Sequence, residues 1–249
     1  MLTGGGQMAT TLRSLREGIA RNPRTQRLLL ACGIVASGWW VAIDVVGSLR
    51  YAGYSYVDQT ISELTAEGAP TRTFMTVVSG VPYVVFMVAF GVGVWMAAGG
   101  RRAGRIAGVV LSAEALWGFA GGLAFPMAMR GVEATPRNEM HAVYGIGMPI
   151  LFLVAIGCGS RLLGGRFRAF SYVAIAVMLV AGILMMPQVA HVATNEPTPW
   201  LGIEERTNAY AAMLWIAVFA AGLLRATRAA APVPDTVVVA PQQVRPLQP

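Results

Sequence analysis

The chain has 249 residues, of which 55% are hydrophobic and 12% are charged. Soluble domains carry about 25% charged residues, so this composition excludes an ordinary water-soluble fold and indicates membrane lipid as the surroundings. The formal net charge is +7, but the basic residues stand beside the ends of apolar segments and do not form the basic surface that nucleic acid requires, so we expect no nucleic-acid partner.

Residues 1–27 form a basic segment ahead of the first apolar stretch. Leu12, Leu15 and Ile19 recur at helical spacing, opposite Arg residues, up to a break at Pro23. This pattern is typical of a short amphipathic helix on anionic lipid, and equally of a solvated basic arm that fixes topology.

Six apolar segments follow, each close to or above the roughly 20 residues that span a bilayer. They cover residues 28–49, 73–98, 104–129, 141–163, 169–191 and 207–224. Their connections leave no room for a soluble domain. The sequence therefore predicts an all-α fold, a polytopic membrane helical bundle with six transmembrane helices over residues 28–228, followed by a disordered Pro-rich tail over residues 229–249.

The first connection carries local signals for helical turns. Thr60 and Glu63 have the spacing of a capping box, Gly68 fits a helix C-terminus, and Pro70 fits a stop just beyond it. We expect one or two helical turns lying on the outer surface of the membrane.

The Arg distribution predicts the orientation. The N-terminal segment carries five Arg residues, and the second connection, the fourth connection and the tail carry three each, whereas the alternate connections together carry five. Positively charged connections are retained in the cytoplasm, so both termini are predicted to face it. Every basic residue is Arg, which is typical of GC-rich bacterial coding. We expect a multi-pass protein of the bacterial inner (plasma) membrane.

Two carboxylates lie inside predicted spans: Asp44 near the outer end of the first, and Glu114 near the middle of the third. Burying a charged side chain in a bilayer costs roughly 2 to 3 kcal/mol or more, so each is expected to face the bundle interior with a partner. For Glu114 the nearest polar groups in depth are Ser79, Tyr83 and Asp44.

Other polar residues gather at the same outer depth, which predicts a cavity opening away from the cytoplasm. Taken singly, each also fits an interfacial anchor or a satisfied core group. The candidate ligand residues are Asp44, Ser79, Tyr83, Glu114, His141, Tyr144, Gln188, His191, Glu204 and Asn208.

No spacing typical of a metal site occurs. The two cysteines, Cys32 and Cys158, fall inside apolar segments, and the two histidines, His141 and His191, lie far apart in the chain. We therefore expect neither a metal nor a cofactor. Small residues at four-residue spacing in the third span, Gly104 with Gly108 and Gly118 with Gly122, favour close helix packing within one chain. The oligomeric state stays open.

Several landmarks lie in the connections or beside them. They are Thr60-Ile61-Ser62-Glu63-Leu64, Gly68-Ala69-Pro70, Phe125-Pro126, His141 and Gly202-Ile203-Glu204-Glu205-Arg206. Together they resemble those of a bacterial membrane family catalogued as domain of unknown function 998. The resemblance covers about residues 28–224 and implies a six-helix membrane architecture without supplying a reaction.

The leading hypothesis is a non-catalytic integral membrane protein that binds or moves a lipid-like or amphiphilic ligand from the outer side, or assists an envelope complex. One alternative is a membrane-embedded metal-dependent hydrolase built from His141, His191, Asp44 and Glu114. Another is a proton-coupled transporter with Glu114 as the carrier, although no internal repeat supports it.

Overall fold

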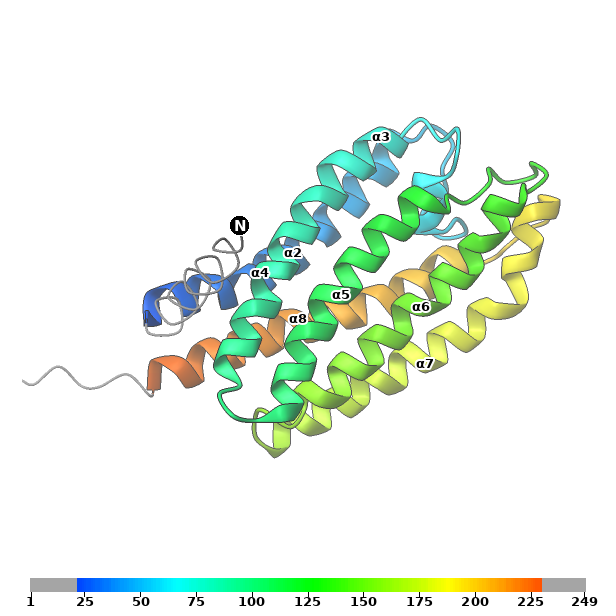
Figure 1. The fold of residues 1–249 in the computed structure, drawn as a ribbon. Coiled ribbons are helices and arrows are strands. Elements are labelled where there is room, and N and C mark those ends of the chain that lie inside the picture. The colour runs from blue at the N-terminus through cyan, green and yellow to red at the C-terminus, as the bar shows by residue number, and fades with distance from the viewer. Residues whose placement is uncertain (1–21, 230–249) are drawn as a thin grey trace, which may run out of the picture.

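The structure is a computed structural model that describes residues 22–229. Within them six helices are long and apolar enough to cross a membrane, which confirms the predicted six-helix, all-α architecture (Figure 1). The predicted amphipathic helix and the Pro-rich tail fall on residues outside this range. In chain order the spans are α2 (Pro23–Arg50), a composite second span of α3 (Arg72–Phe74), η2 (Met75–Gly80) and α4 (Val81–Ala97), then α5 (Arg102–Ala124), α6 (Pro136–Gly159), α7 (Gly165–Thr194) and α8 (Leu201–Ala229).

Capping residues determine where two of the spans begin. The Asn22 side chain accepts hydrogen bonds from two backbone N–H groups in the first turn of α2. The Thr135 side chain accepts from one backbone N–H in the first turn of α6, that of Asn138, and forms a capping box with this residue, directly before Pro136 at the first helical position. Helix α6 therefore begins ahead of its apolar segment, because the caps satisfy N–H groups that hydropathy ignores.

Two span boundaries differ from the hydropathy prediction. Helix α8 begins at Leu201 and not at residue 207, since Glu204, Glu205 and Arg206 lie on its first turns, where protein groups bind all three. Helix α5 ends at Ala124 and not at residue 129, because a proline two residues later disfavours helical geometry in the residue before it.

The spans do not all pack on their neighbours in the chain. Helix α2 packs between α4 and α8, α4 packs on α5, and α5 packs on α6. Helix α7 packs mainly on α8 and touches α6 little, although a short turn joins α6 to α7 (Figure 1). Helix α8 thus lies between α2 and α7.

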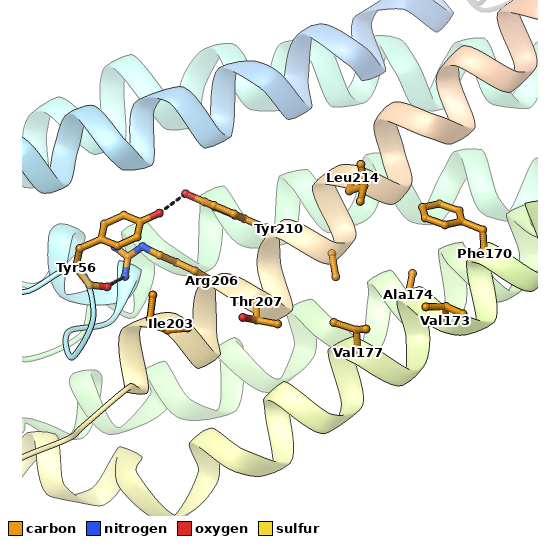
Figure 2. Close-up of a pocket in the computed structure, with 11 residues that line it drawn as sticks. Tyr56, Phe170, Val173, Ala174, Val177, Ile203, Arg206, Thr207, Tyr210 and Leu214 are labelled. Carbon is orange, nitrogen blue, oxygen red and sulfur yellow. Dashed lines mark hydrogen bonds between the residues drawn. The ribbon is translucent and has the colours of Figure 1, made fainter.

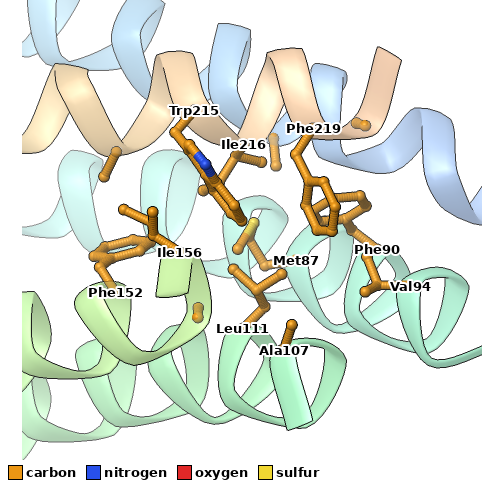
Figure 3. Packing of buried hydrophobic residues seen from close by; sticks show 14 of the residues in the cluster. Met87, Phe90, Val94, Ala107, Leu111, Phe152, Ile156, Trp215, Ile216 and Phe219 are labelled. Atoms are coloured by element: carbon orange, nitrogen blue, oxygen red, sulfur yellow. The ribbon is translucent and has the colours of Figure 1, made fainter. Parts of the chain in front are cut away.

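Helix α8 supplies the largest side chains of the apolar core (Figure 3). The rings of Trp215 and Phe219 lie 4.7 Å apart, and Phe219 meets Phe90 of α4 edge to face at 6.1 Å. The Trp215 indole N–H donates to Ser171 Oγ of α7 at 2.9 Å, so its polar atom is satisfied inside the core. Large apolar side chains are also exposed along the outward faces of the helices, as expected of a surface in lipid.

The second span changes its helical geometry at η2, a π-helical segment that ends directly before α4. Pro82 has no N–H to donate to the Val78 carbonyl four residues earlier. The Trp39 indole of α2 donates to that carbonyl at 2.9 Å instead. The neighbouring helix thus satisfies the backbone group that the proline leaves free.

Glycines bring α5 close to its neighbours within the chain. A Cβ atom at Gly108 would lie 2.5 Å from the Gly91 carbonyl oxygen of α4, and one at Gly118 would lie 2.7 Å from the Met148 side chain of α6. In each of the two predicted small-residue pairs of α5, at least one glycine therefore lies against another helix of the same chain.

The two ends of the bundle differ in the size of their connections. At one end, which we call the loop end, residues 51–71, 125–135 and 195–200 meet; at the other, short turns join α4 to α5 and α6 to α7 (Figure 1). The loop end holds η1 (Ile61–Thr65), a 3₁₀ helix with the predicted Thr60–Glu63 capping box. Glu63 and Leu64 are buried, so this helix packs onto the bundle.

Candidate functional site

A buried ion pair joins the first and last spans at the loop end. Arg206 of α8 donates from Nε to Asp44 Oδ2 at 3.0 Å and from Nη2 to Asp44 Oδ1 at 3.2 Å. The two side chains are only 2% and 1% exposed. Asp44 is therefore compensated inside the protein by a two-pronged guanidinium contact, the strongest geometry for this pair.

The remaining donors of Arg206 hold the first connection. Nη1 donates to the backbone carbonyls of Tyr56, Gln59 and Gly202, at 2.9, 3.0 and 3.2 Å. Its guanidinium carbon also lies 3.7 Å from the centre of the Tyr56 ring. Arg206 therefore fixes the backbone of this connection against the start of α8.

Tyr54 completes the surroundings of the guanidinium. Its oxygen accepts from Arg206 Nη2 at 2.7 Å, and its O–H lies within reach of the carbonyls of Gln59 and Thr60, at 2.9 and 2.7 Å. Burial raises the pKa of Tyr54 above its ordinary value and outweighs the opposing effect of Arg206. The hydroxyl therefore keeps its proton and its donor role. Ser48 Oγ accepts a further hydrogen bond from Nη2, at 3.2 Å.

A chain of hydroxyls extends from this ion pair to the molecular surface. Tyr210 O–H donates to Asp44 Oδ2 at 2.6 Å, and the Tyr56 and Tyr210 oxygens lie 2.8 Å apart (Figure 2). Because the Tyr210 proton points to Asp44, the Tyr56 O–H must be the donor between the two tyrosines. We call these six residues the Arg206 cluster: Asp44, Ser48, Tyr54, Tyr56, Arg206 and Tyr210.

A second ion pair joins the three connections of the loop end. Arg130 binds Glu63 with Nε at 2.9 Å and Nη2 at 3.2 Å, and Nη2 also donates to Thr198 Oγ1 at 2.9 Å. The Glu63 carboxylate accepts in addition from the Thr60 backbone at 2.7 Å and from Gln59 Nε2 at 3.0 Å. These bonds connect residues 51–71 with both later loops.

The start of α8 docks against the first connection through its backbone. A Cβ atom at Gly202 would lie 2.6 Å from the Tyr56 carbonyl oxygen and 2.9 Å from that of Val57, so this position requires glycine. The Ile203 N–H donates to the Val57 carbonyl at 3.0 Å. Glu205 accepts from the Ile61 N–H and, at 3.2 Å, from Ser62 Oγ, both at the start of η1.

A lateral groove runs between α7 and α8 beside the Arg206 cluster (Figure 2). It consists of two adjoining hollows of about 470 and 440 Å³ that share Val177, Ile203 and Thr207 in their walls. Most of the lining is aliphatic or aromatic, from Phe170 on α7 and Leu214 on α8 up to the loop end. Its polar groups lie toward the loop end: the hydroxyls of Tyr56, Thr207 and Tyr210 and the carboxylate of Glu204, with Arg206 behind them.

Glu114 lies apart from this network. It is fully buried in α5, and its Oε2 accepts from the Tyr83 hydroxyl at 3.3 Å, which confirms a predicted partner. Its Oε1 has no hydrogen-bond partner among the described residues. Of the other two expected partners, Asp44 binds Arg206 and Tyr210, and Ser79 is buried in η2.

The other candidate residues are distributed around the loop end and the bundle. His141 Nδ1 lies 2.8 Å from the Phe125 carbonyl oxygen and His191 Nε2 lies 3.6 Å from Glu196. Ser79 is buried in η2. The remaining polar contacts are Gln188 to Glu204 at 3.0 Å, Asn208 to the Met178 carbonyl at 2.7 Å and Tyr144 to the Gly118 carbonyl at 3.3 Å.

The candidates therefore do not converge on one polar cavity. Among them Glu204 lines the α7–α8 groove, and Asp44 lies behind it in the Arg206 cluster. Within residues 22–229 no three His, Cys, Asp or Glu side chains lie close enough together to hold a metal ion. The four residues of the hydrolase alternative each have separate partners.

Sequence reasoning missed Arg206, the central residue of the network. Its charge was assigned to a connection because it follows Glu204 and Glu205. One signal pointed to it: a carboxylate inside a span, Asp44, requires a cation at the same depth, and Arg206 enters the last span at that depth.

Comparison with known proteins places the chain in a family. Residues 34–222 match the family described as "Protein of unknown function (DUF998)", and the chain belongs to it. No curated protein and no solved structure matches the chain. Every residue of the Gly202–Arg206 landmark that carried the resemblance has a partner or a close contact at the loop end.

Proposed function

We propose that this member of the DUF998 family binds a membrane amphiphile in the groove between α7 and α8. The shape and lining of the groove are the main support for this proposal, because the groove combines a long apolar wall with polar groups at one end (Figure 2). The acyl part of the ligand lies along Phe170, Val177 and Leu214. Its polar part lies beside Thr207 and Tyr56.

The length of the groove supports a ligand that occupies one leaflet. Its α8 wall extends from Ile203 to Leu214. At about 1.5 Å per residue this is roughly 16 Å along the helix. The hydrocarbon core of a bilayer is about 30 Å thick, so the groove covers about half of it. This matches one lipid chain with its polar end at the membrane surface.

The Arg206 cluster gives this groove a fixed wall. Arg206 binds α2 through Asp44 and the first connection through two carbonyls, those of Tyr56 and Gln59, so Tyr56 and Tyr210 are held in place before any ligand arrives. A preorganised site loses less conformational freedom on binding than a mobile one. The cluster is thus a positioning element for the polar end of the groove.

The Arg asymmetry of the sequence supports placing this end outside. The loop end joins the connections with few Arg residues, and the short-turn end carries Arg101, Arg102 and Arg105. In a bacterial plasma membrane this arrangement directs the loop end away from the cytoplasm. The groove then opens into the outer leaflet.

Glu114 supports a second candidate function, a proton-coupled transporter. Its Oε1 is fully buried and unpaired within the described residues, and such intramembrane carboxyl groups are typical of proton carriers. The groove favours the amphiphile-binding function, since Glu114 does not line it.

Lipid retention by the purified full chain tests the proposal. Native mass spectrometry from mild detergent is expected to show a retained lipid on the parent protein. Val177→Trp fills both hollows of the groove and should abolish retention. Ile183→Trp is the matched control, since it lies on the same helix, is 69% exposed and does not line the groove. Retention that is equal in both variants would overturn the proposal.

A further inference from the structure

We infer that the α7–α8 groove takes an amphiphile with an uncharged, hydroxyl-bearing head group, of which a diacylglycerol is the simplest chemical example, and discriminates against phosphate. This inference rests on the proposed function and names the ligand class of the same groove. Four properties of its polar end support it: the bonds that its cation already makes, the occupied N–H groups at the start of α8, the Glu204 carboxylate, and the direction of its hydrogen bonds.

Among residues 22–229, the one cation that lines the groove has no donor to spare. Arg206 is 2% exposed, and its guanidinium is neutralised by Asp44. All three of its nitrogens donate to protein acceptors, including Tyr54 and the carbonyl of Gly202. Phosphate groups are held in proteins by free Arg or Lys side chains. Redirecting one of these donors to a phosphate would break a bond to Asp44, to Tyr54 or to a backbone carbonyl.

The start of α8 does not provide a substitute. Backbone N–H groups at a helix N-terminus often bind phosphate. In α8, however, the Ile203 N–H donates to the Val57 carbonyl at 3.0 Å and the Glu204 N–H donates to the Trp200 carbonyl at 2.9 Å. These donors are occupied by the protein itself.

A carboxylate borders the same end of the groove. Glu204 lines the hollow next to Thr207, and its Oε2 accepts from Gln188 Nε2 at 3.0 Å. The Arg206–Asp44 pair contributes no net charge, so Glu204 leaves this end negative. A phosphate would lie near it in a medium of low dielectric, where like charges repel strongly.

The hydroxyls of the groove favour a ligand that donates hydrogen bonds. Tyr210 gives its proton to Asp44, and Tyr56 gives its proton to Tyr210. The Tyr56 oxygen therefore retains acceptor capacity only, as does the Glu204 carboxylate. A glycerol hydroxyl supplies the donor that both require, whereas a fully ionised phosphate ester has none. Thr207 accepts or donates as the ligand demands.

A displacement assay on the purified full chain tests the head-group inference. A fluorescent diacylglycerol is bound in detergent and displaced by two unlabelled lipids with identical acyl chains, diacylglycerol and phosphatidic acid, which differ by the phosphate. The diacylglycerol should displace the probe at a concentration at least about tenfold lower, the equivalent of about 1.4 kcal/mol. Glu204→Gln removes the negative charge and should reduce this ratio, while Thr207→Val removes a hydroxyl that serves either head group and should leave the ratio unchanged.

The possible outcomes test the head-group inference and the proposed function separately. Phosphatidic acid that displaces the probe as well as or better than diacylglycerol would overturn the head-group inference and leave the groove intact as a lipid site. A probe that binds Val177→Trp as well as the parent protein would overturn the proposed function itself. An unchanged displacement ratio in Glu204→Gln would show that the carboxylate does not select the head group and would also count against the inference.

Discussion

Arg206 and Asp44, 162 positions apart in the chain, form a two-pronged ion pair that is almost completely buried where α2 meets α8. It joins the first and last of the described spans. The other donors of Arg206 bind the connection after α2, so one side chain fixes two helices and a loop. The arrangement explains why the loop end is structured although most of it is irregular backbone.

Arg206→Leu should strongly destabilise the protein. The substitution leaves the Asp44 carboxylate buried without its cation, which typically costs about 3 to 5 kcal/mol. The double variant Arg206→Leu with Asp44→Leu should lose clearly less than the sum of the two single variants, because the pair is coupled. Thermal unfolding in detergent measures both. Arg102→Leu, at the exposed start of α5, is the control and should remain near the parent. If the stability lost in the double variant equalled the sum of the losses in the two single variants, the Arg206–Asp44 pairing would be contradicted.

Gly202→Ala should separate the first connection from α8. The added Cβ would meet the carbonyl oxygens of Tyr56 and Val57, which are backbone atoms and cannot rotate away. We expect a lower unfolding temperature and faster limited proteolysis within residues 51–60. Gly157→Ala in α6 is the matched control, since its Cβ would meet nothing within 4 Å. Helix propensity alone favours alanine there by about 0.5 to 1 kcal/mol, so the control should be neutral or slightly stabilised. Equal behaviour of the two variants would refute the close approach.

Glu114→Gln should preserve stability, and Glu114→Leu should not. The glutamine amide still offers an oxygen to the Tyr83 hydroxyl, whereas leucine leaves that hydroxyl buried and unsatisfied at a cost of about 1 to 3 kcal/mol. Adding Tyr83→Phe to Glu114→Leu should recover part of the loss. The readout is the unfolding midpoint in detergent. Indistinguishable unfolding midpoints for the parent protein and both single variants of Glu114 would show that the Glu114–Tyr83 pair has no structural role.

The sequence determined these features to different degrees. Hydropathy located all six spans, and the Thr60–Glu63 capping box was predictable because its two residues lie three positions apart. The Glu114–Tyr83 contact was among the pairs expected from depth alone. These predictions depend only on local pattern or on a position along the membrane normal.

The Arg206 cluster and the groove depend on tertiary geometry. The hydropathy pattern placed Arg206 in a loop. Hydropathy does not take into account that the carboxylate of Asp44, distant in the chain, compensates the charge of Arg206 near the start of α8. The α7–α8 groove requires that α7 packs on α8. No local pattern in either helix specifies that choice of neighbour. Several of the polar side chains expected to line one cavity, among them His141, Tyr144 and Asn208, lie against backbone carbonyls.

Reporter fusions test the orientation that places the loop end outside. Alkaline phosphatase, which is active only when exported, should be active when it is fused after Gly68, Val132 or Pro199, the sites predicted to lie outside. Green fluorescent protein should be fluorescent when it is fused after Gly100, Gly164 or Ala230, the sites predicted to lie in the cytoplasm. A reversed pair of neighbouring sites would contradict the predicted orientation.

The most direct test of amphiphile binding is to map where a photoactivatable diacylglycerol attaches to the full chain in a bilayer nanodisc. If the amphiphile binds in the α7–α8 groove, we expect crosslinked peptides from residues 170–184 of α7 and residues 203–214 of α8. This labelling should be lost in Val177→Trp and retained in Ile183→Trp. Labelling spread evenly over the lipid-facing sides of all six spans, and unchanged by Val177→Trp, would contradict a specific site in this groove.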